Sequence, residues 1–191
     1  MKKYTLVHRF LHWTIGIGML ILFITGFLRM EWMSKKKLSS LIVQETSKEG
    51  VSLSEATLKT IGKNSLEPIW EWHELFAYII LGLFVLRIVY MVVKGIRFPN
   101  PFKHSAPKEK FQGLIYLIFY GLVLMNLVTG FYLMWGDGTY KEQMEELHKT
   151  GIYWFPIFFL IHLAGIVYDE ISKKSGIVSK MINNKKKPSQ Y

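Results

Sequence analysis

Cysteine is absent from this 191-residue chain. Its absence excludes disulfide bridges, iron–sulfur clusters and thiolate metal sites, and it also excludes the C-x-x-C-H motif that attaches a c-type haem covalently. A porphyrin in this protein would therefore have to be held by coordination and packing alone.

Charged side chains are nearly absent from four long apolar runs, of which only one contains a basic residue, Arg87. The runs are Phe10–Leu28, Leu75–Val93, Phe111–Trp135 and Ile152–Tyr168. A soluble amphipathic helix would show a polar stripe, whereas a helix that crosses the hydrocarbon core needs about 20 apolar residues. The sequence therefore predicts an all-α integral membrane four-helix bundle. Its helices are expected over about 8–29, 70–94, 110–135 and 146–170.

The first run lacks the small-x-small cleavage pattern of a signal peptide, although Lys2 and Lys3 precede it. Its apolar stretch is also longer than the roughly 7–15 residues of a signal-peptide core. We therefore expect this run to be retained as a membrane helix.

Acidic residues are scarce in three segments of the chain. Segments 1–11, 94–110 and 169–191 together hold 14 Lys and Arg residues but only 3 acidic residues. Segments 29–71 and 136–150 together hold 9 Lys and Arg residues and 10 acidic residues. Because Lys and Arg concentrate in cytoplasmic loops, this asymmetry predicts that both termini and the 94–110 loop are cytoplasmic.

The net charge of +10 follows from this topology, so no nucleic-acid partner is expected. The basic run Lys185–Lys187 is typical of a solvated tail near anionic lipid headgroups. Several tryptophans gather at the opposite interface of the bilayer, as amphipathic indoles do. They are Trp32, Trp70, Trp72 and Trp135.

The outer loop 30–69 is long for a connection, and we expect it to carry short amphipathic helices. Residues 52–55 (SLSE) fit a capping box, and Gly62 fits the end of the helix that follows. A second short helix is expected over Lys36–Gln44. No internal repeat is convincing, and we expect one membrane domain over residues 1–191.

Four histidines lie near the ends of the apolar runs. His148 and His162 are fourteen positions apart, so on one continuous helix they would share a face, about 21 Å apart along the axis. In the expected topology His12 matches the depth of His162, and His73 matches that of His148. A single such histidine is more often a hydrogen-bonded or interfacial side chain than a ligand. Two depth-matched pairs favour metal ligation, because ionisable groups inside bilayers are costly and usually functional.

Two imidazoles per site fall short of the four ligands that zinc normally takes, but they match the two axial positions of a b-type haem. We therefore expect two non-covalent haem b groups, an inner one bound by His12 and His162 and an outer one bound by His73 and His148. Glycines inside the runs would give room for a porphyrin or for ordinary close packing of helices, and both interpretations stay open. They are Gly16, Gly18, Gly26, Gly82, Gly121 and Gly130.

Arg87 is the one basic residue deep inside a run, fourteen positions after His73. It would share the face of His73 and lie at the depth of the inner haem, where a propionate needs a cation; alternatively it snorkels to the inner interface. Arg9 is a weaker contact to the same haem. His8, one turn before His12, suits propionate or headgroup contact better than ligation.

Other polar residues are expected to carry less of the chemistry. Asn126 and Thr129 are expected to form interhelical hydrogen bonds, and His104 to be solvated in a loop. Weaker contacts to the outer haem are Arg29, Lys149 and Trp135.

The combination of LHW in the first run, a histidine opening the second, an arginine fourteen positions later and His-x13-His along the fourth resembles the bacterial cytochrome b561 group. That group overlaps the b-type cytochrome subunits of nickel–iron hydrogenases and formate dehydrogenases. The resemblance covers the four runs. It implies a four-helix bundle in the bacterial inner (cytoplasmic) membrane that carries two b haems, one near each membrane face, ligated by the two histidine pairs given above.

Members of this group exchange electrons with quinone and with a periplasmic partner such as a cytochrome or a hydrogenase-type subunit. A small single-subunit type instead exchanges electrons with superoxide, and the long outer loop departs from that type. The expected function is therefore transmembrane electron transfer between quinone and a periplasmic redox partner, with the quinone near the inner haem. A superoxide:quinone oxidoreductase, a histidine-containing metal transporter and a structural membrane anchor remain the alternatives.

Overall fold

The computed structural model describes residues 4–95, 99–102, 106–173 and 176–182, and every regular element within these ranges is a helix. Four helical segments of this part of the chain are long and apolar enough to cross a membrane. They are Leu6–Trp32, Glu67–Lys94, Pro107–Trp135 and Lys141–Ser172. The prediction of an all-α membrane protein with four spans is thereby confirmed. His104 and Lys185–Lys187 lie outside the described residues.

The helices divide between two compact units, Met1–Gly16 with Leu83–Tyr191, and Ile17–Gly82. Two long helices, α1 (Leu6–Phe27) and α4 (Glu67–Lys94), each contribute one part to either unit. Both consist almost wholly of apolar residues, as expected for helices whose surroundings are lipid and other spans. The assignment of residues 1–191 to a single domain stays a prediction.

Within the unit Ile17–Gly82, α1 and α4 approach closely at a glycine. A Cβ atom on Gly18 would lie 2.6 Å from Ile80 Cδ1, and the Ile80 side chain is 1% exposed. This glycine therefore serves helix packing, which is one of the two uses that its position in the sequence left open.

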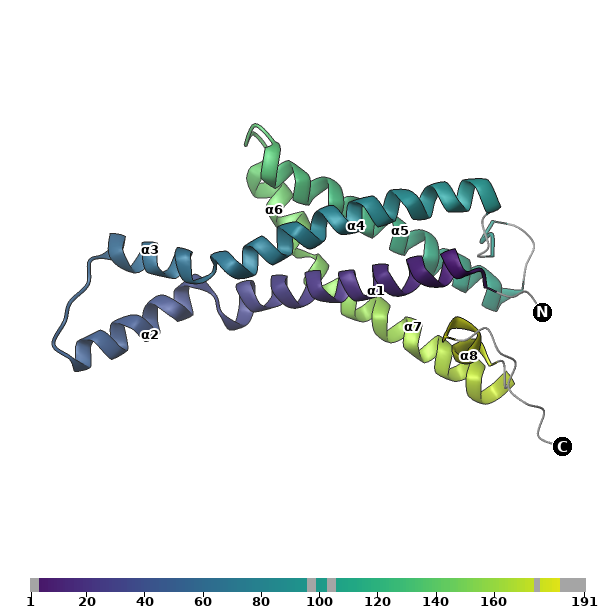
Figure 1. The fold of residues 1–191 in the computed structure, drawn as a ribbon, viewed down its shortest axis with the longest axis horizontal. Coiled ribbons are helices and arrows are strands. Elements are labelled where there is room, and N and C mark those ends of the chain that lie inside the picture. Colours follow the sequence, from purple (N-terminus) through teal and green to yellow (C-terminus); the bar gives the residue numbers. More distant parts are fainter. Residues whose placement is uncertain (1–3, 96–98, 103–105, 174–175, 183–191) are drawn as a thin grey trace. The chain divides into compact units, whose positions relative to one another are not determined.

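The long loop of the same unit is almost entirely helical. A π-helix, η1 (Leu28–Trp32), extends α1, and two helices follow, α2 (Lys35–Lys48) and α3 (Glu55–Ser65). Figure 1 shows α2 and α3 side by side beyond the adjoining ends of α1 and α4. The two helices form a hairpin, named here the α2–α3 arm.

The predicted details of the α2–α3 arm need correction. The N-cap of α3 is Ser54 rather than Ser52, since the Ser54 hydroxyl oxygen accepts from the backbone N–H of Thr57 at 3.1 Å. Gly62 does not end α3 but lies buried inside it, where a Cβ atom would be 3.4 Å from Ser39 Oγ. Its small size lets α2 and α3 pack closely. Helix packing therefore explains the presence of glycine at this position better than a role in ending α3 does.

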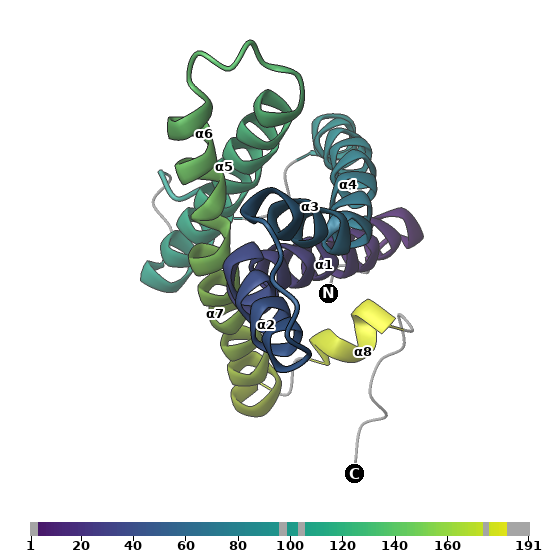
Figure 2. The same cartoon turned by 90° about the vertical axis from the view of Figure 1, so that its left-hand side faces the viewer.

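The other unit contains α5 (Pro107–Trp135), α6 (Lys141–Lys149), α7 (Gly151–Lys173) and α8 (Ile177–Ile182). Figure 2 shows α6 alongside the end of α5. In the turn between them the Tyr132 hydroxyl donates to Asp137 Oδ1 at 2.7 Å, which lowers the pKa of that carboxyl. An ion pair between Lys108 and Asp169 joins α5 to α7.

The predicted fourth helix over 146–170 lies within the span Lys141–Ser172, which α6 and α7 form together with one turn residue, Thr150, between them. The Thr150 hydroxyl donates to the carbonyl oxygen of Leu147 at 2.6 Å. The side-chain amide of Asn126 donates to the carbonyl oxygen of His148 at 3.0 Å. These side chains satisfy carbonyl groups that would otherwise depend on the helix itself. The two histidines of the His-x13-His stretch therefore lie on different helices.

Candidate functional site

His12 on α1 and His162 on α7 face each other within one unit of the structure. Their ring centroids are 5.9 Å apart, and their planes are inclined by 52°. A metal–imidazole nitrogen bond is about 2.0–2.1 Å long, so two imidazoles on opposite sides of one metal ion have centroids about 6 Å apart. The observed separation fits a shared metal ion.

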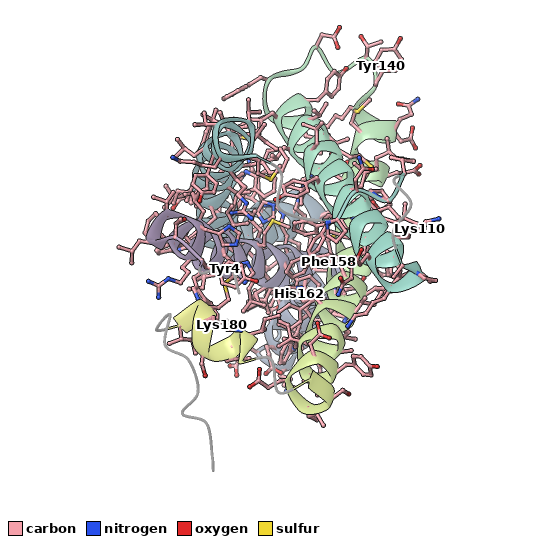
Figure 3. All side chains as sticks on the ribbon, turned by 90° about the vertical axis from the view of Figure 1, so that its right-hand side faces the viewer. Tyr4, Lys110, Tyr140, Phe158, His162 and Lys180 are labelled. Atoms are coloured by element: carbon pink, nitrogen blue, oxygen red, sulfur yellow. The ribbon has the colours of Figure 1, made fainter. Side chains whose placement is uncertain are left out.

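Aromatic rings surround this histidine pair. The His162 ring stacks on Phe158, one turn earlier on α7, with centroids 5.8 Å apart and planes 11° apart; Figure 3 labels both residues. Phe158 in turn stacks on Phe119 of α5 at 4.0 Å, and Trp13 meets the His12 ring edge-on at 5.7 Å. An apolar, aromatic wall suits a large planar cofactor and excludes water from it.

Arg87 of α4 contacts His8, which lies one turn before His12 on α1. Its Nη1 is 3.0 Å from His8 Nδ1, and its Nε donates to the Tyr120 hydroxyl at 3.3 Å. His8 is 8% exposed and stacks on Tyr4 at 5.0 Å. Arg87 is thus held by protein groups, and its role toward a propionate stays a prediction.

Arg9, the weaker predicted cofactor contact, binds a different part of the chain. Its Nη1 donates to the carbonyl oxygen of Ile182 at 2.7 Å. Trp13 Nε1 donates to the neighbouring carbonyl of Met181 at 3.3 Å. Both side chains therefore hold the end of α8 against the start of α1. Arg9 Nε is buried without a hydrogen-bond partner among the described residues.

His73, in the unit Ile17–Gly82, is bound by a threonine of α1. Its Nδ1 lies 2.8 Å from the Thr25 hydroxyl oxygen. Its ring is stacked on Trp70, with centroids 5.7 Å apart and planes 9° apart, and Arg29 lies over the Trp70 ring at 4.2 Å. Gly26 lies directly beside the His73 ring, since a Cβ atom there would be 3.6 Å from Cε1.

His148, in the other unit, has closely similar surroundings on α5. Its Nδ1 is 3.1 Å from the carbonyl oxygen of Asn126 and 3.2 Å from the Thr129 hydroxyl oxygen. A Cβ atom on Gly130 would lie 2.9 Å from Cε1 of the His148 ring. Asn126 and Thr129 do form the predicted interhelical hydrogen bonds, but their partner is a predicted ligand.

The structure thus brings His12, His162 and Arg87 together, while the pairing of His73 with His148 stays a prediction. Of the weaker contacts, Lys149 forms an ion pair with Glu145 at 2.5 Å, and Trp135 packs on Phe131 at 5.0 Å. Sequence reasoning missed Thr25, Phe158 and Tyr120 as neighbours of the histidines. For Thr25 a signal existed, because Thr-Gly-Phe occurs at 25–27 and again at 129–131.

The donor set fits a haem better than a hydrated or tetrahedral metal ion. No group of three or more His, Cys, Asp or Glu side chains that could hold a metal ion occurs among the described residues. His12 and His162, with their aromatic neighbours, would supply two nitrogen ligands and an apolar wall to a b-type haem.

Four apolar spans, two of which carry imidazole rings 5.9 Å apart, are the features of a multi-pass membrane cytochrome of the b type. The family model of the prokaryotic cytochrome b561 matches residues 3–184, and the chain belongs to this family. No curated protein and no solved structure matches it. Membership makes the chain a bacterial membrane protein of a family that binds b-type haem and transfers electrons across the membrane.

Proposed function

We propose that this protein carries electrons across the bacterial inner membrane through two b-type haems, between the quinone pool and a periplasmic redox partner. The facing pair of His12 and His162, with ring centroids 5.9 Å apart, is the observation that carries the proposal. These two residues would bind one haem, and Arg87 would pair with one of its propionates.

His73 and His148 would bind the second haem. Each of these histidines has Nδ1 within 3.2 Å of a threonine hydroxyl oxygen and has a glycine beside its ring. A histidine that binds metal through Nε2 commonly donates its Nδ1 proton to such an outer partner. The matched surroundings support a shared role for the two residues.

A haem with two imidazole ligands supplies outer-sphere electron transfer, because its iron has no open position for oxygen. The residues of this chain would do the remaining work. The imidazoles fix the iron, the Phe158 and Phe119 rings exclude water, and Arg87 balances the charge of a propionate.

The two reaction partners are proposed to meet opposite ends of the spans. We expect quinone to react near the His12–His162 pair, where His8 and Tyr120 offer hydrogen-bonding groups beside Arg87. We expect the periplasmic partner to meet the α2–α3 arm, which lies beyond the adjoining ends of α1 and α4 (Figure 1). The arm argues against the small superoxide-reactive type, which has a short loop there.

Spectroscopy of the purified protein tests this proposal. We expect a red preparation with a b-type reduced-minus-oxidised spectrum, two haems per chain and reoxidation of the reduced protein by a quinone analogue. His12→Ala should lower the haem content to one per chain. His8→Gln, one turn away on the same helix, is the matched control and should keep two.

Three results would contradict the proposal. A colourless protein that binds zinc would support a metal transporter, and a haem-free protein required only for assembly of a complex would support a structural anchor. Rapid oxidation of superoxide by the chain alone, coupled to quinone reduction, would support the superoxide:quinone oxidoreductase.

A further inference from the structure

A Thr-Gly pair recurs at both histidines that we assign to the second haem. Thr25-Gly26 of α1 contacts His73 of α4, and Thr129-Gly130 of α5 contacts His148 of α6. Each pair is followed by phenylalanine. We name each pair a Thr-Gly cradle, since the threonine bonds the imidazole and the glycine leaves space for it.

The threonine hydroxyl proton has a defined partner in the first cradle. Thr25 Oγ1 donates to the carbonyl oxygen of Ile21, four residues earlier in α1, at 2.8 Å. Its oxygen can then only accept from His73, whose Nδ1 is 2.8 Å away. Nδ1 therefore carries the proton, and the Nε2 lone pair is available for metal ligation.

The second cradle has the same arrangement. Thr129 is 3% exposed, and its hydroxyl donates to the carbonyl oxygen of Met125 at 2.8 Å. His148 Nδ1, at 3.2 Å from Thr129 Oγ1 and 3.1 Å from the Asn126 carbonyl oxygen, must therefore be the donor. Because both acceptors lie on Nδ1, this histidine also has its proton there.

Asn126 holds the backbone of the second histidine as well as its ring. Its side-chain oxygen accepts from Trp154 Nε1 at 3.1 Å, and an indole N–H can only donate. The orientation of the amide is therefore fixed, and its nitrogen donates to the carbonyl oxygen of His148. A Cβ atom on Gly151 would lie 2.7 Å from that nitrogen and would have to displace the amide from this hydrogen bond.

We propose that Thr25 and Thr129 are positioning residues that fix the proton of His73 and His148 on Nδ1 and thereby tune the reduction potential of the haem bound there. This inference rests on the proposed function. An acceptor on Nδ1–H makes the ligand more basic, and a more basic ligand stabilises ferric iron. The cradles should therefore lower the potential of this haem.

Redox titration of the purified holoprotein tests the proposal. Thr129→Val removes the hydroxyl but keeps the shape of the side chain. We expect the reduction potential of one haem to rise, with a change of about tenfold in the equilibrium between its two oxidation states, or about 59 mV for one electron. Thr25→Val should raise the potential of the same haem.

Conservative and control variants separate this role from a structural one. Thr129→Ser keeps the hydroxyl and loses a methyl group, so the potential should stay near that of the wild type even if the melting temperature falls. Thr14→Val removes a hydroxyl that likewise donates to its own helix, at 2.8 Å to Phe10. Its removal should leave the haem that depends on His148 unchanged.

The outcomes distinguish the two proposals. Wild-type protein without a second haem would refute the proposed function itself. Wild-type protein with two haems whose potentials do not move in Thr25→Val and Thr129→Val would overturn only the tuning role. If the two variants instead shift different haems, the assignment of His73 and His148 to one haem is refuted, because both cradles are argued to act on the same iron.

Discussion

The His12–His162 pair and the two Thr-Gly cradles place histidines in opposite electrostatic surroundings. The cation Arg87 contacts His8, one turn before His12, and the rings of Phe158 and Trp13 contact the histidine pair. His73 and His148 instead face hydroxyl and carbonyl oxygens through Nδ1. A nearby cation favours ferrous iron, whereas acceptors on the ligand favour ferric iron.

Surroundings of this kind would give the two proposed haems different reduction potentials although their chemistry is identical. We expect the haem of the His12–His162 pair to be the higher in potential and the haem of the cradles the lower. Electrons that enter at the cradle end would then move downhill toward Arg87.

Removal of one ligand from each site should abolish haem binding. We expect His12→Ala with His148→Ala to yield protein without haem, because each remaining imidazole lacks its partner. His73→Ala with His148→Ala should instead keep one haem of higher potential, because both residues are assigned to the same iron. Pyridine haemochrome assays and redox titration measure both quantities. Loss of both haems in the second pair of substitutions would disprove the assignment.

Filling one cradle should have the next largest effect. A methyl group at Gly130 would lie 2.9 Å from Cε1 of His148, so Gly130→Ala must displace the ring. We expect this variant to lose most of its lower-potential haem. Gly121→Ala, on the same helix with no atom within 4 Å of the added carbon, should bind two haems. Equal haem content in the two variants would refute the cradle geometry.

Loss of the cation should change potential rather than haem content. Arg87→Met removes a charge close to the His12–His162 pair, and we expect that haem to become harder to reduce by about 1–2 kcal/mol, as for charge interactions at an effective dielectric near 20. Arg87→Lys should restore part of the difference. A redox titration that showed the lower-potential haem moving instead would reverse the assignment of the two sites.

Helix packing remote from the histidines should affect only stability. Gly18→Ala would place a methyl group 2.6 Å from Ile80 Cδ1, and overpacking of this kind costs about 1–3 kcal/mol. Gly16→Ala, with open space around the added carbon, is the matched control. Thermal unfolding in detergent should separate the two variants, while both keep wild-type potentials. A shift in potential at Gly18 would show that its role is not packing alone.

The span positions could be predicted from hydropathy because the bilayer imposes one length on every crossing helix. The positions of side chains could not be predicted so well. The turn at Thr150 is stabilised by a hydrogen bond from Asn126, which is distant in sequence. The N-cap of α3 is Ser54, but Ser52 in the same short stretch is equally suitable as an N-cap residue. The approach of His12 to His162 followed from depth, but their aromatic neighbours did not.

Arg9 and Trp13 hold the last carbonyl groups of α8, although 173 and 168 residues separate the partners in sequence. The first helix leaves the ribosome long before residues 181 and 182 exist. Its hydrogen bonds to α8 therefore form only after residues 181 and 182 have been synthesised, later than the contact between His8 and Arg87 can form. A chain that stops before residue 177 would lack both hydrogen bonds, so the start of its first helix would be held less firmly.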